Sequence, residues 1–153
     1  MADRTISEVI KAIRDTLATA AGIEWTQGQD EITEGVPVTP LVQCYWAGFE
    51  KSPDSGSDRI TYAIDIDTKP IRETVHRVNV DVLARQRSHI DLDLDAVADT
   101  AEAIDAVLED QNAEPLFGSA YLKAFDYTVE FVNFESGGVI YAGERFNLEI
   151  WLF

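Results

Sequence analysis

Residues 122–153 read LKAFDYTVEFVNFESGGVIYAGERFNLEIWLF, and the class of fold follows most directly from this segment. From Leu122 to Asn133 apolar side chains alternate with polar ones, which is the pattern of a strand with one buried face. Ser136-Gly137-Gly138 supplies turn residues, and the alternation resumes from Phe146 to the C-terminus. The stretch therefore predicts a long β-hairpin.

Three segments further upstream also have the character of strands. Residues 41–46 form an apolar run, and residues 59–67 and 73–84 each alternate between apolar and polar side chains. Because Lys69-Pro70 forms a turn signal between the last two, we expect them to pair as an antiparallel hairpin. Residues 26–40 and 50–58 combine Gly, Pro, Ser and acidic residues, and we expect loops there, the second one exposed and mobile.

Two segments have helical spacing, at about 6–20 and 92–109. Thr5 and Glu8 have the spacing of a capping box for the first helix, and Gly22 suits the left-handed residue that often ends a helix. The second helix should bury a narrow stripe of residues three or four apart, namely Leu94, Val97, Ala101, Ile104 and Leu108.

The resulting element order is α-β-β-β-α-β-β, without the regular βαβ alternation of a parallel sheet. The sequence predicts an α+β fold, with a mostly antiparallel sheet covered on one face by two helices. A chain of 153 residues fits a single domain, so we expect residues 1–153 to share one core.

The composition is strongly acidic, with 28 Asp and Glu against 12 Lys and Arg and a net charge of −16. This balance argues against a surface that binds nucleic acid or an anionic membrane. It fits either a halophilic host or a surface that must repel DNA, such as a conduit wall. With no membrane-spanning run and no signal-peptide pattern, we expect a cytoplasmic origin. Cys44 is the only cysteine and is expected to pack in the core.

No pattern predicts a catalytic residue, a metal site or a cofactor, so we expect a non-enzymatic protein. His76 and His89 have no ligand spacing and are interpreted as ordinary surface or core residues. Five acids have the spacing of a calcium loop, but Ala96 occupies the position that needs Gly, so we interpret them as the acidic start of a helix. These acids are Asp91, Asp93, Asp95, Asp99 and Glu102.

Large apolar side chains at two places are open to two interpretations. Tyr45 and Trp46 could anchor an interface, but we expect them to pack in the core. Trp151 and Phe153 pack either into their own core or against a neighbouring subunit.

The order of elements over nearly the whole chain resembles that of the tail terminator proteins of long-tailed phages and related viruses. The features that carry the resemblance are an N-terminal amphipathic helix, the 41–46 strand, the loop at 50–58, two strands ending in Val78-Asn79-Val80-Asp81-Val82, an Ala-rich helix at 92–109, and a hairpin closing on Arg145-Phe146-Asn147-Leu148-Glu149-Ile150.

The resemblance implies a virion protein, assembled in the host cytoplasm, that forms a hexameric ring on the tail tube. Such a ring would end tube polymerisation, dock the head connector or another neck protein, and pass DNA through an acidic lumen. Two segments then become candidates for contacts with adjacent rings: the 50–58 loop, with Glu50, Lys51, Asp54, Ser55 and Asp58, and the 134–139 turn, with Glu135 and Ser136. The alternatives are another neck or head-completion protein of a tailed virus, and a small ligand-binding domain of a halophile.

Overall fold

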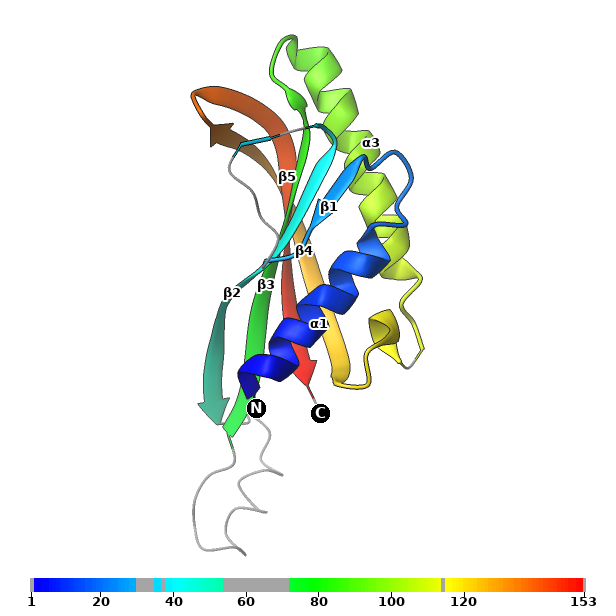
Figure 1. Ribbon diagram of the computed structural model, residues 1–153, viewed down its shortest axis with the longest axis vertical. Helices are drawn as coiled ribbons and strands as arrows, with labels where there is room; N and C mark the ends of the chain where they lie inside the picture. Colours follow the sequence, from blue (N-terminus) through cyan, green and yellow to red (C-terminus); the bar gives the residue numbers. More distant parts are fainter. Residues whose placement is uncertain (1, 30–34, 37, 54–71, 114, 153) are drawn as a thin grey trace, which may run out of the picture.

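The computed structural model describes residues 2–29, 35–36, 38–53, 72–113 and 115–152. Its strands form one five-stranded sheet in the order β1-β2-β3-β5-β4, antiparallel except for the β1–β2 pair. Two helices lie on the same face of this sheet (Figure 1). The predicted α+β fold and its element order are confirmed. The elements are α1 (Ala2–Leu17), β1 (Trp25–Gln27), β2 (Leu41–Pro53), β3 (Arg72–Gln86), α3 (Ile90–Glu109), the 3-10 turn η1 (Leu116–Gly118), β4 (Leu122–Ser136) and β5 (Val139–Leu152).

The C-terminal hairpin forms as its sequence predicts. Ser136 pairs with Val139, so Gly137 and Gly138 are the two residues of the turn. Both have positive φ, at 58° and 81°. A two-residue turn of this kind matches the twist of the flanking strands, and glycine adopts it without steric cost.

The predicted loop at 50–58 begins too early. β2 continues to Pro53, and Glu50 and Lys51 pair with Val75 and Thr74 of β3. Glu50 and Lys51 are therefore strand residues, because cross-strand pairing with a long neighbour outweighs their weak strand propensity. Asp54, Ser55 and Asp58 lie outside the described residues, as does Phe153.

The predicted pairing of 59–67 with 73–84 is wrong. β3 is hydrogen bonded to β2 on one side and to β5 on the other, so both of its edges are occupied. The 59–67 segment itself and the Lys69-Pro70 turn lie outside the described residues. Periodicity identified β3 as a strand, but the identity of its neighbours depends on contacts distant in sequence.

The expectation of a loop throughout 26–40 is also wrong at its start. Trp25, Thr26 and Gln27 form β1, which pairs in parallel with Leu41–Gln43 at the edge of the sheet. A strand of three residues is too short to show an alternating pattern, so its own sequence gave no signal.

Both helices form close to their expected positions, with corrections at their ends. α1 begins at Ala2, so Thr5 lies inside the helix and the predicted capping box does not start it. The helix ends at Leu17 rather than near residue 20, and Gly22 has the expected left-handed φ of 78° in the turn that follows. In α3, Leu94 is 48% exposed and is not part of the buried stripe.

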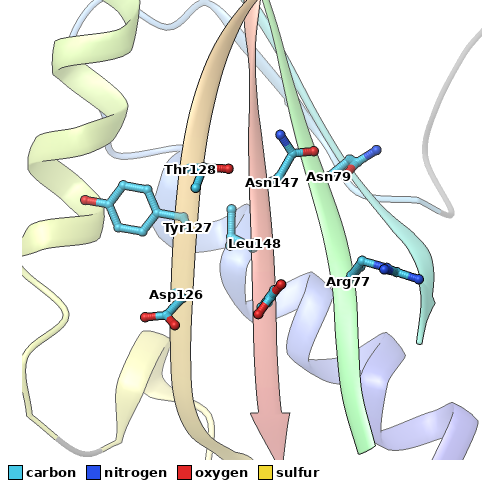
Figure 2. A pocket seen from close by; sticks show the side chains of 8 residues that line it. Arg77, Asn79, Asp126, Tyr127, Thr128, Asn147 and Leu148 are labelled. Carbon is cyan, nitrogen blue, oxygen red and sulfur yellow. The ribbon is translucent and has the colours of Figure 1, made fainter. Parts of the chain in front are cut away.

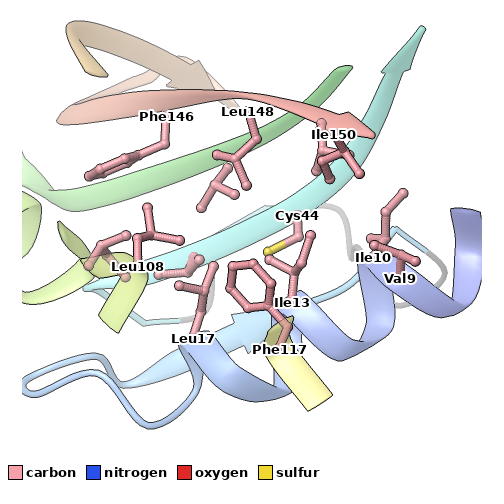
Figure 3. Close-up of a cluster of buried hydrophobic side chains, with 14 of the residues drawn as sticks. Val9, Ile10, Ile13, Leu17, Cys44, Leu108, Phe117, Phe146, Leu148 and Ile150 are labelled. Atoms are coloured by element: carbon pink, nitrogen blue, oxygen red, sulfur yellow. The ribbon is translucent and has the colours of Figure 1, made fainter. Parts of the chain in front are cut away.

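The core lies between the helices and one face of the sheet (Figure 3). α1 packs mainly on β2, and α3 packs on β3 and β5. Cys44 is fully buried in this layer, as its apolar neighbours predict. Other members of the core are Val9, Ile10, Ile13 and Leu17 from α1, Ile104 and Leu108 from α3, Val78, Val80 and Val82 from β3, and Phe146, Leu148 and Ile150 from β5.

Candidate assembly surfaces

The second face of the sheet carries no helix among the described residues, and we call it the helix-free face. Strand alternation turns a different set of side chains toward it from each strand, because successive residues point to opposite faces. Most of them are polar. They are Tyr45 from β2, Arg77, Asn79 and Asp81 from β3, Arg145, Asn147 and Glu149 from β5, and Asp126, Thr128 and Glu130 from β4.

A network of hydrogen bonds lies at the centre of the helix-free face. Asp81 is only 5% exposed and accepts hydrogen bonds from Arg145 Nε at 2.6 Å and from the Tyr45 hydroxyl at 2.6 Å. Asp81 raises the pKa of Arg145, and burial together with the bond to Asp81 raises the pKa of Tyr45. The Phe134 ring lies 5.7 Å from the guanidinium carbon of Arg145. Sequence alternation placed Asp81 on a polar face but did not reveal that it is buried.

A hollow of about 360 Å³ lies on the same face beside this network. Figure 2 shows Arg77, Asn79, Asp126, Thr128 and Asn147 along it. Glu149 also lines it, together with Tyr127 and Leu148. The lining has two carboxylates, one guanidinium, two amides and the Thr128 hydroxyl. The hollow therefore presents charged and amide groups to its surroundings.

The predicted contact residues fall at opposite ends of the sheet. Glu50 pairs with Val75, which pairs on its other side with Trp151, so one row of residues joins Glu50 and Trp151. Glu135 and Ser136 are at the β4–β5 turn. A strand of 15 residues spans roughly 50 Å, so the two groups cannot belong to one small site. Trp151 is partly buried, while its neighbour Ile150 is in the core.

An exposed aromatic cluster on β2 and β3 corrects the expectation that Trp46 packs in the core. Trp46 is 41% exposed, and its ring lies 6.1 Å from that of Phe49. The indole N–H of Trp46 donates to His76 Nδ1 at 3.2 Å. Burial, and then the charge of Lys51, lower the pKa of His76. β2 is near the edge of the sheet, and Trp46 and Phe49 are both exposed there, so apolar content alone did not predict burial.

A second exposed apolar region lies where β4 meets α3. Val129 and Phe131 share the helix-facing side of β4, yet each is about half exposed. Nearby, the Tyr127 hydroxyl lies 2.6 Å from Asp105 Oδ1 and 3.0 Å from Glu109 Oε1 of α3. Burial and these two carboxylates raise the pKa of Tyr127. Because the helix stops short of the outer side of β4, these apolar side chains remain uncovered within the described structure.

Of the five acids with calcium-loop spacing, Asp93 is buried and the other four are exposed. All five lie on the continuous helix α3. The buried carboxylate of Asp93 forms salt bridges with Arg85 Nε and Arg87 Nε, each at 3.2 Å. The Ser88 backbone N–H also donates to Asp93. A carboxylate in the first turn is stabilised by the positive end of the helix dipole. Among the described residues no group of three or more His, Cys, Asp and Glu is arranged to hold a metal ion.

Glu144 is a buried acid that its sequence position did not single out. It is 1% exposed beneath α3 and accepts a hydrogen bond from Thr100 Oγ1 at 2.7 Å. Burial raises the pKa of Glu144 to about 7, and the bond from Thr100 opposes that rise. Because Glu144 is buried against α3, we expect its ionisation to change the free energy of unfolding rather than contacts at the surface.

No helix in the described parts of the chain has the length and apolarity needed to cross a membrane. No protein-family model matches the sequence, and no curated protein shows significant similarity to it.

Proposed function

We propose that this chain is a structural protein of a tailed virus, forming a hexameric ring that caps the tail tube, ends its polymerisation and joins the tail to the head connector. The helix-free face carries the proposal. Within the described structure this face is uncovered and mostly polar, which suits it to lining a wet passage.

The layering of the fold supports a lumen on that face. In a ring whose sheets stand around a central channel, the thicker helix layer fits on the outside, where the circumference is larger. Asp81 and Arg145 neutralise each other, so the remaining charge comes from Asp126, Glu130 and Glu149 against Arg77. A net negative lining repels phosphates, which lets DNA pass without adhering.

The length of the sheet supports two separate docking ends. Glu50 and Lys51 lie toward one end, and Glu135 and Ser136 lie at the other. A ring built from such subunits has one end for the tail tube and the opposite end for a connector or neck protein. The non-enzymatic role and the absence of a cofactor are part of the same proposal.

The test is native mass spectrometry of the purified chain, alone and mixed with a candidate tail-tube protein, with light scattering in multi-molar salt. A six-fold ring, alone or on the tube, together with shorter tubes in electron micrographs, is the expected result. A monomer that ignores the tube would overturn the proposal and favour a neck adaptor or a ligand-binding domain.

Charge reversals at the two ends sharpen this test. Glu50→Arg and Glu135→Arg each change one end of the sheet, and both residues are exposed. We expect both variants to keep the ring, while only one of them weakens binding to the tube. Equal binding by both variants would argue against docking through either end.

A further inference from the structure

At both edges of the sheet there is strand backbone that no described strand pairs with. β4 is hydrogen bonded to β5 alone, so one side of its whole length is open within the described structure. At the other edge β1 covers only Leu41–Gln43, which leaves the rest of β2 without a second strand among the described residues. One backbone N–H there, that of Trp46, donates to the Gln29 side chain. Long open edges of this kind are sites where another strand adds.

The strand directions make the two edges compatible with each other. β2, β3, β5 and β4 are antiparallel in succession, so β2 and β4 run in opposite directions. A second copy placed beside the first, with its helices on the same face, would therefore bring its β2 antiparallel to β4 of the first copy. Antiparallel pairing then continues the sheet from one copy to the next.

The exposed apolar side chains are on matching sides of the two edges. Val129 pairs with Phe146 and Trp46 pairs with Val78, so all four face the helices. The exposed apolar residues on the β4 side are Val129 and Phe131 of β4 and Leu94 of α3. Those on the β2 side are Trp46 and Phe49 of β2. Across the sheet Trp46 lies level with Tyr127, so a second copy must be displaced by a few residues along the strands for these two exposed groups to meet. In that staggered arrangement they share one face, where burying their surfaces stabilises the contact.

The distribution of charge favours contact between unlike edges. α3 carries seven acidic residues and no basic one, and it lies beside β4. α1, which packs on β2, has three acidic and three basic residues. A contact between two β4 edges would set two acidic helices near each other, whereas a contact between β4 and β2 sets an acidic flank against a neutral one. Repulsion is smaller in the second case.

We infer that copies of this chain associate head to tail, with β4 and α3 of one copy against β2 and α1 of the next. The inference rests on the proposed ring and names its subunit contact. A head-to-tail contact is heterologous and leaves one open edge at each end of a chain of copies, so it closes only when the last copy reaches the first.

A matched pair of substitutions on α3 tests this contact. Leu94 and Leu92 are 48% and 47% exposed, respectively. They are two positions apart and so point about 160° away from each other around the helix. Leu94 and Asp105 are eleven residues apart, about three turns of the helix, so they lie on the same side of α3. Tyr127 of β4 contacts Asp105, so this side of α3 is the one near β4. Leu94→Glu should break the ring into monomers in native mass spectrometry, and Leu92→Glu should keep it.

A mixing experiment separates head-to-tail contact from the alternatives. Phe131→Glu removes the β4 flank and Phe49→Glu removes the β2 flank, at side chains that are 47% and 48% exposed. Each variant alone should be monomeric, with the circular dichroism of the unaltered chain, and an equimolar mixture should give a 1:1 dimer. A Phe49→Glu variant that still dimerises by itself would indicate contact between like edges and would overturn the inference.

The two proposals fail in different ways. A ring that survives both Leu94→Glu and Phe131→Glu overturns the contact and leaves the ring intact. A 1:1 dimer from the mixed variants, with a ring of the unaltered chain that ignores the tail tube, supports the contact and overturns the terminator function.

Discussion

Arg145 and Asp81 form an ion pair between neighbouring strands, with Arg145 Nε 2.6 Å from Asp81 Oδ1 and Arg145 Nη2 3.2 Å from Asp81 Oδ2. The two residues are cross-strand partners of β3 and β5. Because Asp81 is nearly inaccessible to water, its charge depends on the guanidinium and on the Tyr45 hydroxyl for compensation. The pair, together with Tyr45, therefore links the side chains of β2, β3 and β5 at the centre of the helix-free face.

Removing one member of this pair should destabilise the fold. Arg145→Met leaves the carboxylate of Asp81 buried without its cation, and we expect a loss of about 3 kcal/mol in the free energy of unfolding. Urea denaturation measures this loss. Glu149→Gln is the control, since Glu149 is exposed on the same strand, and it should change stability by less than about 0.5 kcal/mol. Equal effects of the two substitutions would contradict the role of the pair.

Glu144 should make stability depend on pH in a direction opposite to that of a salt-bridged acid. Its pKa is raised to about 7 in the folded protein from an ordinary value of 4.5, so the folded state holds the proton more tightly than the unfolded state does. The stabilisation is fully present below pH 4.5 and is lost as pH rises through about 7.

Comparing urea unfolding at pH 5 and pH 8 isolates this effect. Glu144→Gln keeps an acceptor for Thr100 and carries no charge. It should be more stable than the unaltered chain at pH 8, by up to about 3 kcal/mol, and close to it at pH 5. An equal difference at both pH values would show that the carboxyl does not titrate there.

Salt should stabilise the protein. The net charge is −16, and α3 alone carries seven acids, so like-charge repulsion opposes the compact state at low ionic strength. We expect the melting temperature to rise between 0.1 M and 3 M KCl, with most of the electrostatic gain at the low end, where screening changes most. A melting temperature indifferent to salt would count against haloadaptation as the reason for the acidity.

Gly143 should not tolerate a side chain. A Cβ atom there would lie 1.9 Å from the Val82 carbonyl oxygen and 2.9 Å from the Phe134 ring. The nearest atom is backbone and cannot move aside cheaply, so Gly143→Ala should cost about 2 kcal/mol or more. Thermal unfolding measures this cost. A neutral effect would mean that β3 and β5 are further apart than they are here.

Cys44 should be chemically silent in the folded state. Burial raises the pKa of its thiol and also blocks access to reagents. Iodoacetamide should label the protein only after denaturation in urea, at a single site, since Cys44 is the only cysteine. Rapid labelling of the native protein, followed by mass spectrometry, would show that α1 opens readily from β2.

The sequence predicted the elements with strong periodicity and failed where pairing depended on distant residues. The β4–β5 hairpin formed as expected because alternation and the two glycines specify it locally. The partner of β3 was wrong, since hydrogen bonding of a strand edge is decided by whichever segment the tertiary fold brings there. Trp46 and Leu94 were expected in the core but are exposed, Trp46 on β2 near an edge of the sheet and Leu94 on α3 outside its buried stripe.

Some of the candidate surfaces could be predicted from the sequence, and others could not. Glu50, Lys51, Glu135, Ser136 and Trp151 were named from the sequence, and the structure separates them into the two ends of one sheet. The helix-free face and the open edges of β2 and β4 had no signal of their own. In the described part of the chain they arise because α1 and α3 pack on the same side of the sheet and because β2 and β4 lie at or near its two edges.

Periodicity and composition were enough to predict the α+β class, the acidic character and the apolar faces that form the core, because these signals act over a few residues at a time. The folded arrangement was needed to establish the strand order, the burial of Asp81 and Glu144, and the identity of the exposed apolar side chains. Those properties depend on which distant segments come into contact, and a local pattern carries no record of its neighbours in space.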